Sequence, residues 1–192
     1  GKAAVKVLEA AGFEVTLEAR RKCCGRPACS RGVLDEVRRL AEHNLAVFKD
    51  GTEPIIFLEA SCYTMFVDEY RQLKLPGADA VARRCVLFEQ FVYELLSREP
   101  QALPFKSGLI NKVGIHGHCH AKAMSNAAIM PKLANALPGA DARLLDTGCC
   151  GMAGAFGMLR SKLELSKQVA QDLIDKINAC EPGTTIVASG TS

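Results

Sequence analysis

The chain has 192 residues, of which 48% are hydrophobic and 23% are charged, and its formal net charge is +3. This composition is typical of a globular protein with one domain or two small lobes, and it excludes a disordered, collagen-like or coiled-coil chain. Because 24 basic residues nearly balance 21 acidic ones, the charge gives no reason to expect nucleic-acid binding. No apolar run approaches the roughly 20 residues of a transmembrane helix, so we expect no membrane span.

The first residues, 1–8, lack an initiator Met and the apolar core of a signal peptide. We therefore expect a piece of a cytoplasmic protein, which partners could hold peripherally at the inner membrane.

Apolar runs and helical periodicity alternate along the chain and predict an α/β fold. Such alternation is typical of mostly parallel sheets covered by helices. A segment rich in Pro and Gly, 99–108, is the expected linker. The expected elements, in chain order, are a helix over 2–11 that ends at Gly12, a strand over 13–17, a helix over 31–49, a strand over 54–59, a helix over 79–98, strands over 111–115 and 142–146, a helix over 157–179 and a strand over 184–188.

Nine cysteines are the unusual feature of this composition. An odd number leaves one thiol unpaired in any disulfide framework, and a chain of this length can form a core without disulfides. Three interpretations stay open from the count: a metal or cluster site, redox-active thiols, or buried cysteines that pack as small hydrophobic residues.

The cysteines follow an internal repeat. Cys23-Cys24-Gly25 and Cys149-Cys150-Gly151 each come after a predicted strand and before a long predicted helix. We expect two pseudo-symmetric repeats, over 1–99 and 109–192, in one compact unit. In this alignment Ser192 corresponds to Ser61, and both ends of the chain are expected to lie within a repeat.

The repeat also predicts where the thiols lie. The carboxyl ends of parallel strands meet at one edge of a sheet, where ligands bind, and Cys62 and Cys119 follow predicted strands as the two pairs do. Thiols beside helix N-termini have a lowered pKa and are good metal ligands. Gly25 and Gly151 suit a tight turn close to a cluster. The predicted ligands are Cys23, Cys24 and Cys62 at one site, and Cys119, Cys149 and Cys150 at the other, a number of thiolates suited to an iron–sulfur cluster.

These motifs resemble the CCG or cysteine-rich domain, which occurs in heterodisulfide reductase B subunits and in iron–sulfur subunits of glycolate, lactate and anaerobic glycerol-3-phosphate dehydrogenases. Residues 23–27, 116–120 and 148–157 look most like the C-terminal segment of FAD-linked oxidases, and the resemblance covers almost the whole chain. It implies a 4Fe-4S cluster and an electron-transfer module of a flavin-dependent 2-hydroxyacid dehydrogenase of the glycolate or D-lactate type, which relays electrons to a quinone or another carrier.

The same resemblance implies partners. FAD is expected only on a partner flavin-binding domain or subunit, where the hydroxyacid would react, and a ferredoxin-like cluster domain is expected beside it. The family pattern has a further cysteine upstream of the first motif and downstream of the second. With three thiolates in each repeat, we expect a cluster in this chain alone to be labile.

Two alternatives stay open. One is a thiol/disulfide reductase module of the heterodisulfide reductase B type, in which a cluster cleaves a disulfide. The other is an interaction domain stapled by zinc, with His116, His118 and His120 alternating along an extended segment and Cys119 on its other side. His118 and His120 could equally bind or relay protons beside a cluster. Cys85, expected within a helix, Cys180 and Cys29 are expected to be packing or incidental residues.

Overall fold

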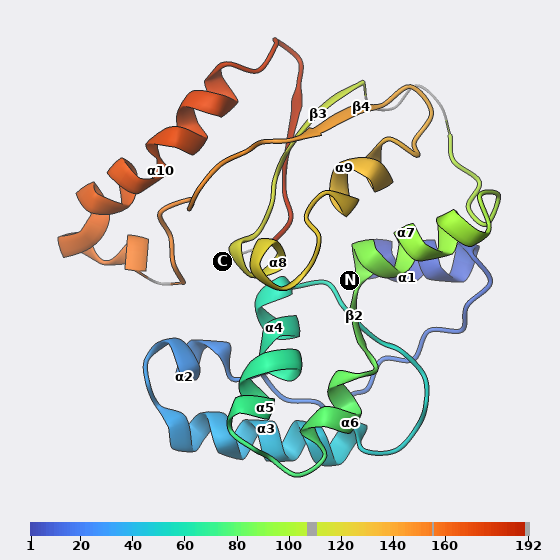
Figure 1. Cartoon of the computed structure of the whole chain (residues 1–192), viewed down its shortest axis with the longest axis vertical. Helices are drawn as coiled ribbons and strands as arrows, with labels where there is room; N and C mark the ends of the chain where they lie inside the picture. The colour runs from blue at the N-terminus through green and yellow to red at the C-terminus, as the bar shows by residue number, and fades with distance from the viewer. Residues whose placement is uncertain (107–110, 155, 191–192) are drawn as a thin grey trace. The chain divides into compact units, whose positions relative to one another are not determined.

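The computed structural model describes residues 1–106, 111–154 and 156–190 (Figure 1). The chain divides into two compact units, Gly1–Leu103 and Pro104–Ser192, so the division falls within the expected linker. Two sequence expectations lie outside the described residues: Ser192 as the counterpart of Ser61, and the end of the linker at 107–108.

Unit 1 pairs a two-stranded parallel sheet with short helices. Strands β1 and β2 pair in register, with Ile55 beside Cys85 and Phe57 beside Leu87. In Figure 1 the helical segments between β1 and β2 are drawn just above α3. The elements of unit 1 are α1 (Lys2–Ala10), α2 (Arg26–Ser30), α3 (Leu34–Phe48), β1 (Ile55–Phe57), α4 (Ala60–Thr64), the π-helix η1 (Met65–Glu69), α5 (Tyr70–Gln72), α6 (Ala78–Ala82), β2 (Cys85–Leu87) and α7 (Phe88–Arg98).

The core of unit 1 forms where α3 packs against the helical run from α4 to α6. Met65 and Tyr70 are fully buried there, and Phe66 contacts the rings of Phe48 and Phe57 edge-on or tilted. Cys24 belongs to the same cluster of buried residues. The first Cys-Cys-Gly motif is therefore anchored directly on the hydrophobic core.

Two sequence predictions for unit 1 are wrong. Residues 13–17 form no strand, because no strand in the described part of the chain pairs with them; Phe13 instead contacts the ring of Phe91, and Leu17 is 72% exposed. The expected helix over 79–98 is divided into α6 and α7 by strand β2. Parallel pairing with β1 overrides helical periodicity here, since Cys85-Val86-Leu87 has the branched and apolar side chains that suit a strand. The helix over 2–11 is confirmed, and Gly12 after it has a φ of +87°.

Unit 2 contains a three-stranded parallel sheet in the order β4-β3-β5. All three strands coincide with predicted ones within one or two residues, so the α/β class with parallel strands is confirmed. The elements are β3 (Lys112–His116), α8 (Cys119–Met124), α9 (Ile129–Ala134), β4 (Asp141–Leu144), the 3-10 turns η2 (Phe156–Met158) and η3 (Arg160–Lys162), α10 (Leu163–Asn178) and β5 (Thr185–Ala188).

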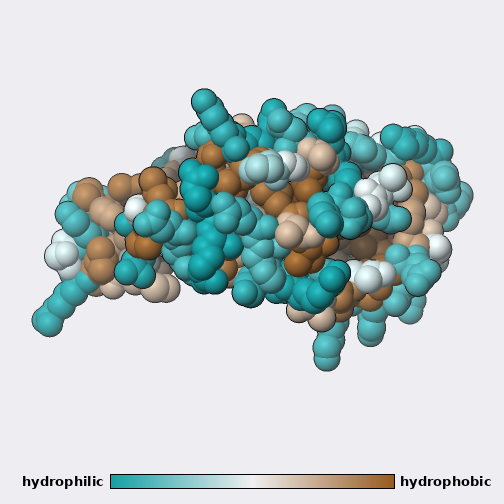
Figure 2. Space-filling model, turned by 90° about the horizontal axis from the view of Figure 1, so that it is seen from below, coloured by the Kyte–Doolittle hydropathy of each residue, from teal (hydrophilic) through white to brown (hydrophobic). Residues whose placement is uncertain are grey.

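The last helix begins later than predicted, because two 3-10 turns occupy residues 156–162. Its apolar side chains are largely exposed, as are those of the edge strand β5, and Figure 2 shows apolar residues reaching the surface between hydrophilic ones. Within the described ranges, no helix is long and apolar enough to cross a membrane.

A matched pair of leucine variants tests the core of unit 1. Leu45→Ala removes a side chain that is 4% exposed and should lower the free energy of unfolding of unit 1 by about 2–5 kcal/mol. Leu17→Ala, at a side chain that is 72% exposed, should change it by less than about 0.5 kcal/mol. All three tyrosines, Tyr63, Tyr70 and Tyr93, lie in unit 1, so tyrosine fluorescence during urea unfolding reports on this unit. Equal losses in the two variants would contradict the assignment of this core.

Candidate functional site

The first Cys-Cys-Gly motif forms a tight turn at the start of α2. Gly25 has a φ of +89°, a left-handed conformation that glycine adopts without strain, and Pro27 occupies the first turn of the helix. The Gly25 N–H donates to the Cys23 Sγ across 3.5 Å. The turn places Cys24 in the core and leaves Cys23 exposed, so the adjacent thiols occupy different environments.

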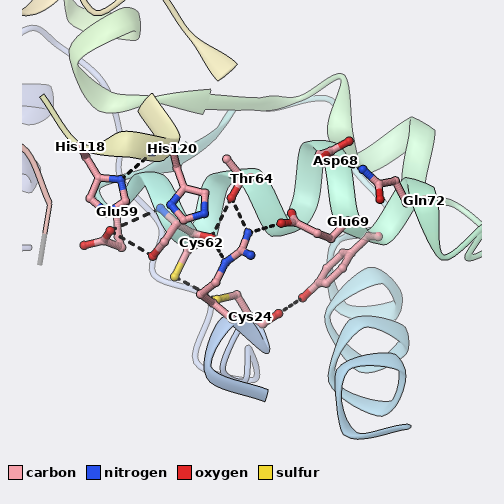
Figure 3. A network of polar contacts seen from close by, with 12 residues as sticks. Cys24, Glu59, Cys62, Thr64, Asp68, Glu69, Gln72, His118 and His120 are labelled. Carbon is pink, nitrogen blue, oxygen red and sulfur yellow. Dashed lines mark hydrogen bonds and ion pairs between the residues drawn. The ribbon is translucent and has the colours of Figure 1, made fainter. Parts of the chain in front are cut away.

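Cys62 reaches this turn from the other side. It lies in α4, which follows β1 and begins at Glu59, whose side chain accepts the Ser61 N–H. The Cys24 thiol donates to the Cys62 sulfur across 3.1 Å (Figure 3). This hydrogen bond, together with burial, raises the pKa of Cys24, and the same bond lowers the pKa of Cys62. Of the two thiols, Cys62 therefore loses its proton more readily than Cys24.

Two buried side chains hold the backbone of the first motif. Asn44 on α3, fully buried, accepts the Lys22 N–H at 2.8 Å and donates to the Cys23 carbonyl at 3.1 Å. Tyr70, also fully buried, donates its hydroxyl to the Cys24 carbonyl at 2.7 Å. Burial raises the pKa of Tyr70, so this donor keeps its proton. The motif is thus fixed by hydrogen bonds that need no metal.

The second motif repeats the geometry of the first. Gly151 has a φ of +83°, and its N–H donates to the Cys149 Sγ across 3.3 Å. A β-carbon at Gly151 would lie 2.2 Å from the backbone oxygen of Ser166 on α10, so only glycine fits there. The Ser166 hydroxyl in turn donates to the Gly151 carbonyl at 2.9 Å.

Cys119 supplies the third thiol of unit 2. It is the first residue of α8, just after β3, and Cys149 and Cys150 follow the neighbouring strand β4. Partial burial and the negative charge of Cys149 raise the pKa of Cys119, with smaller contributions from Cys150 and from a hydrogen bond with Cys149. Both cysteines of the pair therefore influence Cys119 electrostatically.

The two motifs share a further contact that the sequence analysis did not predict. Asp172 on α10 accepts the Gly148 N–H at 3.3 Å, just as Asn44 accepts the Lys22 N–H. In both units the helix after the motif therefore holds the residue that precedes the cysteine pair. Lys122 of α8 adds a cation, which donates to the carbonyls of Thr147 at 2.8 Å and Gly148 at 3.0 Å.

The predicted geometry of the histidine segment is wrong. His116 ends β3 and bonds Thr147 through Nδ1 at 2.8 Å, whereas His118 caps α8 and accepts the His120 N–H at 3.1 Å. The segment is not extended beyond His118, because the helix α8 begins at Cys119 and includes His120. The His118 and His120 rings stack with centroids 5.2 Å apart. Gly190 approaches His118 so closely that a β-carbon there would lie 2.2 Å from the ring.

The remaining cysteines pack as small side chains. Cys85 lies in β2 rather than within a helix, and burial raises its pKa to about 12. Cys29 and Cys85 pack against the core of unit 1. Cys180, just after α10, bonds the Lys176 carbonyl through its sulfur at 3.2 Å.

The six predicted ligands are all thiols, the donor type that suits a soft metal or an iron–sulfur cluster. Among the residues that the structure describes, no three His, Cys, Asp or Glu side chains are arranged as a ready metal site. Two thiolates on one tetrahedral zinc would stand about 3.8 Å apart, farther than the Cys24 and Cys62 sulfurs at 3.1 Å. The thiols therefore fit such a group in donor type, and Cys24 and Cys62 approach each other as a hydrogen-bonded pair.

Sequence reasoning missed the residues that position the cysteines, although one signal was present. Asn44 is three residues after Ala41 and four after Leu40, on the apolar face of the helix. A polar residue on such a face requires hydrogen-bond partners inside the protein. Lys122 and Asp172 gave no comparable signal, because a charged residue in a helix with exposed positions does not by itself require partners inside the protein.

Comparison with known proteins matches the two segments of the chain that carry the Cys-Cys-Gly motifs. The cysteine-rich domain (CCG) profile matches residues 1–67 and 113–191. The chain is 28% identical to the C subunit of the anaerobic glycerol-3-phosphate dehydrogenase from Escherichia coli (strain K12), over 98% of this chain and 48% of that protein. It is 28% identical to lactate utilization protein A of Bacillus cereus (strain G9842), over 92% of this chain and 74% of that protein, and 29% identical to the Bacillus thuringiensis (strain Al Hakam) protein of that name, over 95% and 76%.

The chain spans about half the length of the glycerol-3-phosphate dehydrogenase subunit. No solved structure matches it. The two profile matches each include one Cys-Cys-Gly turn, and they confirm the resemblance drawn from the motifs. One of the proteins that this chain resembles is a subunit of a dehydrogenase. The chain itself belongs to the cysteine-rich (CCG) domain family.

Proposed function

We propose that the chain is an iron–sulfur electron-transfer module of a flavin-dependent 2-hydroxyacid dehydrogenase of the glycolate or D-lactate type. The observation that carries this proposal is the repeated arrangement of thiols: each unit brings a Cys-Cys-Gly turn together with a cysteine from another segment. In unit 1 the Cys24 thiol is hydrogen-bonded to Cys62, and in unit 2 the charge of Cys149 raises the pKa of Cys119. All-thiolate donor sets are typical of iron–sulfur clusters.

Each repeat lobe, 1–99 and 109–192, would hold one 4Fe-4S site. Cys23, Cys24 and Cys62 would be the ligands in the first lobe, and Cys119, Cys149 and Cys150 those in the second. When bound, such a cluster supplies one-electron transfer. The chain itself contributes cations near the thiols: after the hydrogen bond from Cys24, the charge of Arg26 also lowers the pKa of Cys62, and the charge of Lys122 partly offsets the rise in the pKa of Cys119.

The glycines and histidines have supporting roles in this proposal. Gly25 and Gly151 allow the backbone to turn beside a cluster, and each aims its N–H at the sulfur of a proposed ligand. His118 and His120 border the Cys119 site, because they flank that cysteine in sequence and stack on each other. Hydrogen-bond donors around cluster sulfurs influence the reduction potential.

The proposed partners follow from the relatives. One relative is a dehydrogenase subunit about twice as long as the matched segment. We propose a flavin-binding domain or subunit that carries FAD and oxidises the hydroxyacid, and a ferredoxin-like cluster domain. Electrons would pass from the flavin through this chain to a quinone or another carrier, in a cytoplasmic assembly that partners hold at the inner membrane.

Metal and sulfide analysis tests the proposed cofactor. The protein that contains this chain, isolated without oxygen, should hold iron and acid-labile sulfide in similar amounts. Cys24→Ser and Cys149→Ser should each remove about half of both, because each variant removes a ligand from one of two sites. Cys180→Ser should leave both unchanged, since the Cys180 sulfur bonds only the Lys176 carbonyl among the contacts described.

Metal and sulfide analysis, combined with activity assays, separates the alternatives. Zinc without sulfide would contradict the proposal and favour a zinc-stapled interaction domain. Iron and sulfide combined with reduction of a disulfide substrate, and no electron transfer from a flavin partner, would favour a thiol/disulfide reductase module instead.

A glycine pair tests whether the turn shapes the second site. Gly151→Ala should lower the iron and sulfide of unit 2 severalfold, because its β-carbon would collide with the Ser166 carbonyl. Gly183→Ala is the matched control: Gly183 has a similar φ of +84°, but a β-carbon there meets no described atom within 4 Å. The control variant should cost about 1 kcal/mol in stability and should retain the metal. Equal metal content in the two variants would show that the turn is not required.

A further inference from the structure

Arg26, the residue directly after the first Cys-Cys-Gly motif, links this motif to the helix that carries Cys62. Its guanidinium donates to the Ser61 carbonyl at 3.3 Å and to the Thr64 hydroxyl at 2.6 Å, and it forms an ion pair with Glu69. Ser61 and Thr64 lie on either side of Cys62 in α4. The Arg26 side chain is only 17% exposed, so these bonds form in a largely desolvated place.

A π-helical turn brings the partners of this link into position. The helical run from Ala60 to Gln72 changes from α to π over Met65–Glu69 and then returns to α. A π turn adds one residue, so the residues after it are rotated by about 100° relative to a continuous α-helix. In this register Glu69 meets Arg26, and Tyr70 meets the Cys24 carbonyl (Figure 3).

Glu69, the acidic partner of the ion pair, has one carboxylate oxygen that is buried and, within the described residues, unsatisfied. The second carboxylate oxygen of Glu69 is buried and has no hydrogen-bond partner among the residues that the structure describes. A buried carboxylate with an unsatisfied oxygen is destabilising unless a cation lies beside it. Arg26 is therefore required by Glu69 as well as by the backbone near Cys62.

The second motif lacks this device. Met152 occupies the position after Cys149-Cys150-Gly151, so the corresponding side chain carries no charge. In unit 2 the cation is Lys122, which lies on the helix that begins with Cys119 and donates to the carbonyls of Thr147 and Gly148 just before the motif, so there the cation comes from the helix of the third cysteine and not from the motif. The two sites are thus held in different ways.

We propose that Arg26 is a positioning residue that holds the Cys62 thiol against the Cys24 thiol, so that unit 1 presents a preformed pair before any metal binds. This inference rests on the proposed function only in taking the two thiols as ligands of one group. The pair is preformed because Arg26 fixes Cys62 while Tyr70 and Asn44 fix the Cys-Cys backbone.

The test measures the proximity of the two sulfurs in the metal-free chain. Diamide oxidises two neighbouring thiols: an S–S bond forms, two S–H bonds break, and two electrons and two protons reduce the azo group to a hydrazine. After remaining thiols are alkylated, mass spectrometry of the digest gives the rate of the Cys24–Cys62 link. Arg26→Met, which copies the second motif, should slow this link about tenfold, as expected for the loss of charged hydrogen bonds. The rate of the link in Arg26→Lys should lie between the rates in the unchanged chain and in Arg26→Met, because an ammonium cannot bridge the same acceptors as a guanidinium fork.

Arg84→Met is the matched control. Arg84 is also 17% exposed, and it bonds the carbonyls of Phe48, Asp50 and Glu53 in the same unit, so its loss should destabilise unit 1 similarly without slowing the Cys24–Cys62 link. If Arg26→Met fails to fold, Glu69→Gln, which keeps the shape but removes the ion pair, should still slow the link severalfold. Unchanged rates in the folded Arg26 and Glu69 variants, or equal slowing in Arg84→Met, would overturn the proposal.

This outcome is independent of the cofactor. If the protein that contains this chain holds no iron and sulfide, the proposed function fails, yet the cross-linking rates still decide whether Arg26 positions the pair. If it does hold a cluster and the rates are unchanged, the positioning role fails while the proposed function stands.

Discussion

The left-handed turn at the glycine of each Cys-Cys-Gly motif is the constraint on which both sites depend. It turns the backbone between two adjacent thiols and a helix, and it aims the glycine N–H at the sulfur of the first cysteine. Once the turn is set, the third thiol needs only to arrive from a neighbouring strand end, which the parallel sheets provide.

The two units satisfy this constraint with different side chains. Unit 1 uses the buried Asn44 and Tyr70 and the largely shielded Arg26, whereas unit 2 relies on the more exposed Lys122 and Asp172. The hydrogen bonds of unit 1 are better shielded from water and are therefore stronger electrostatically. This difference predicts that a group bound in unit 1 would be held in a more rigid environment than one bound in unit 2.

Whether a predicted strand or helix agrees with the structure depends on the sequence pattern from which it was predicted. The strands of unit 2 were predictable, because their apolar runs are short and bounded by turn residues. The strand over 13–17 was not, because its apolar alternation had no partner strand among the described residues, and β2 was hidden in a helical pattern until it paired with β1. The histidine segment failed for a local reason: His118 caps a helix, which ends the extended conformation.

The sequence by itself determined the repeat, the six cysteines and the family, since these depend on residue type and spacing alone. Only the tertiary structure decided which thiols meet, because Cys24 and Cys62 are 38 positions apart and their contact depends on how α3 and the π turn pack. It also decided the positioning residues. A side chain such as Arg26 or Asn44 acquires its role only when distant backbone groups are brought within hydrogen-bond distance, and no periodicity in the chain records that distance.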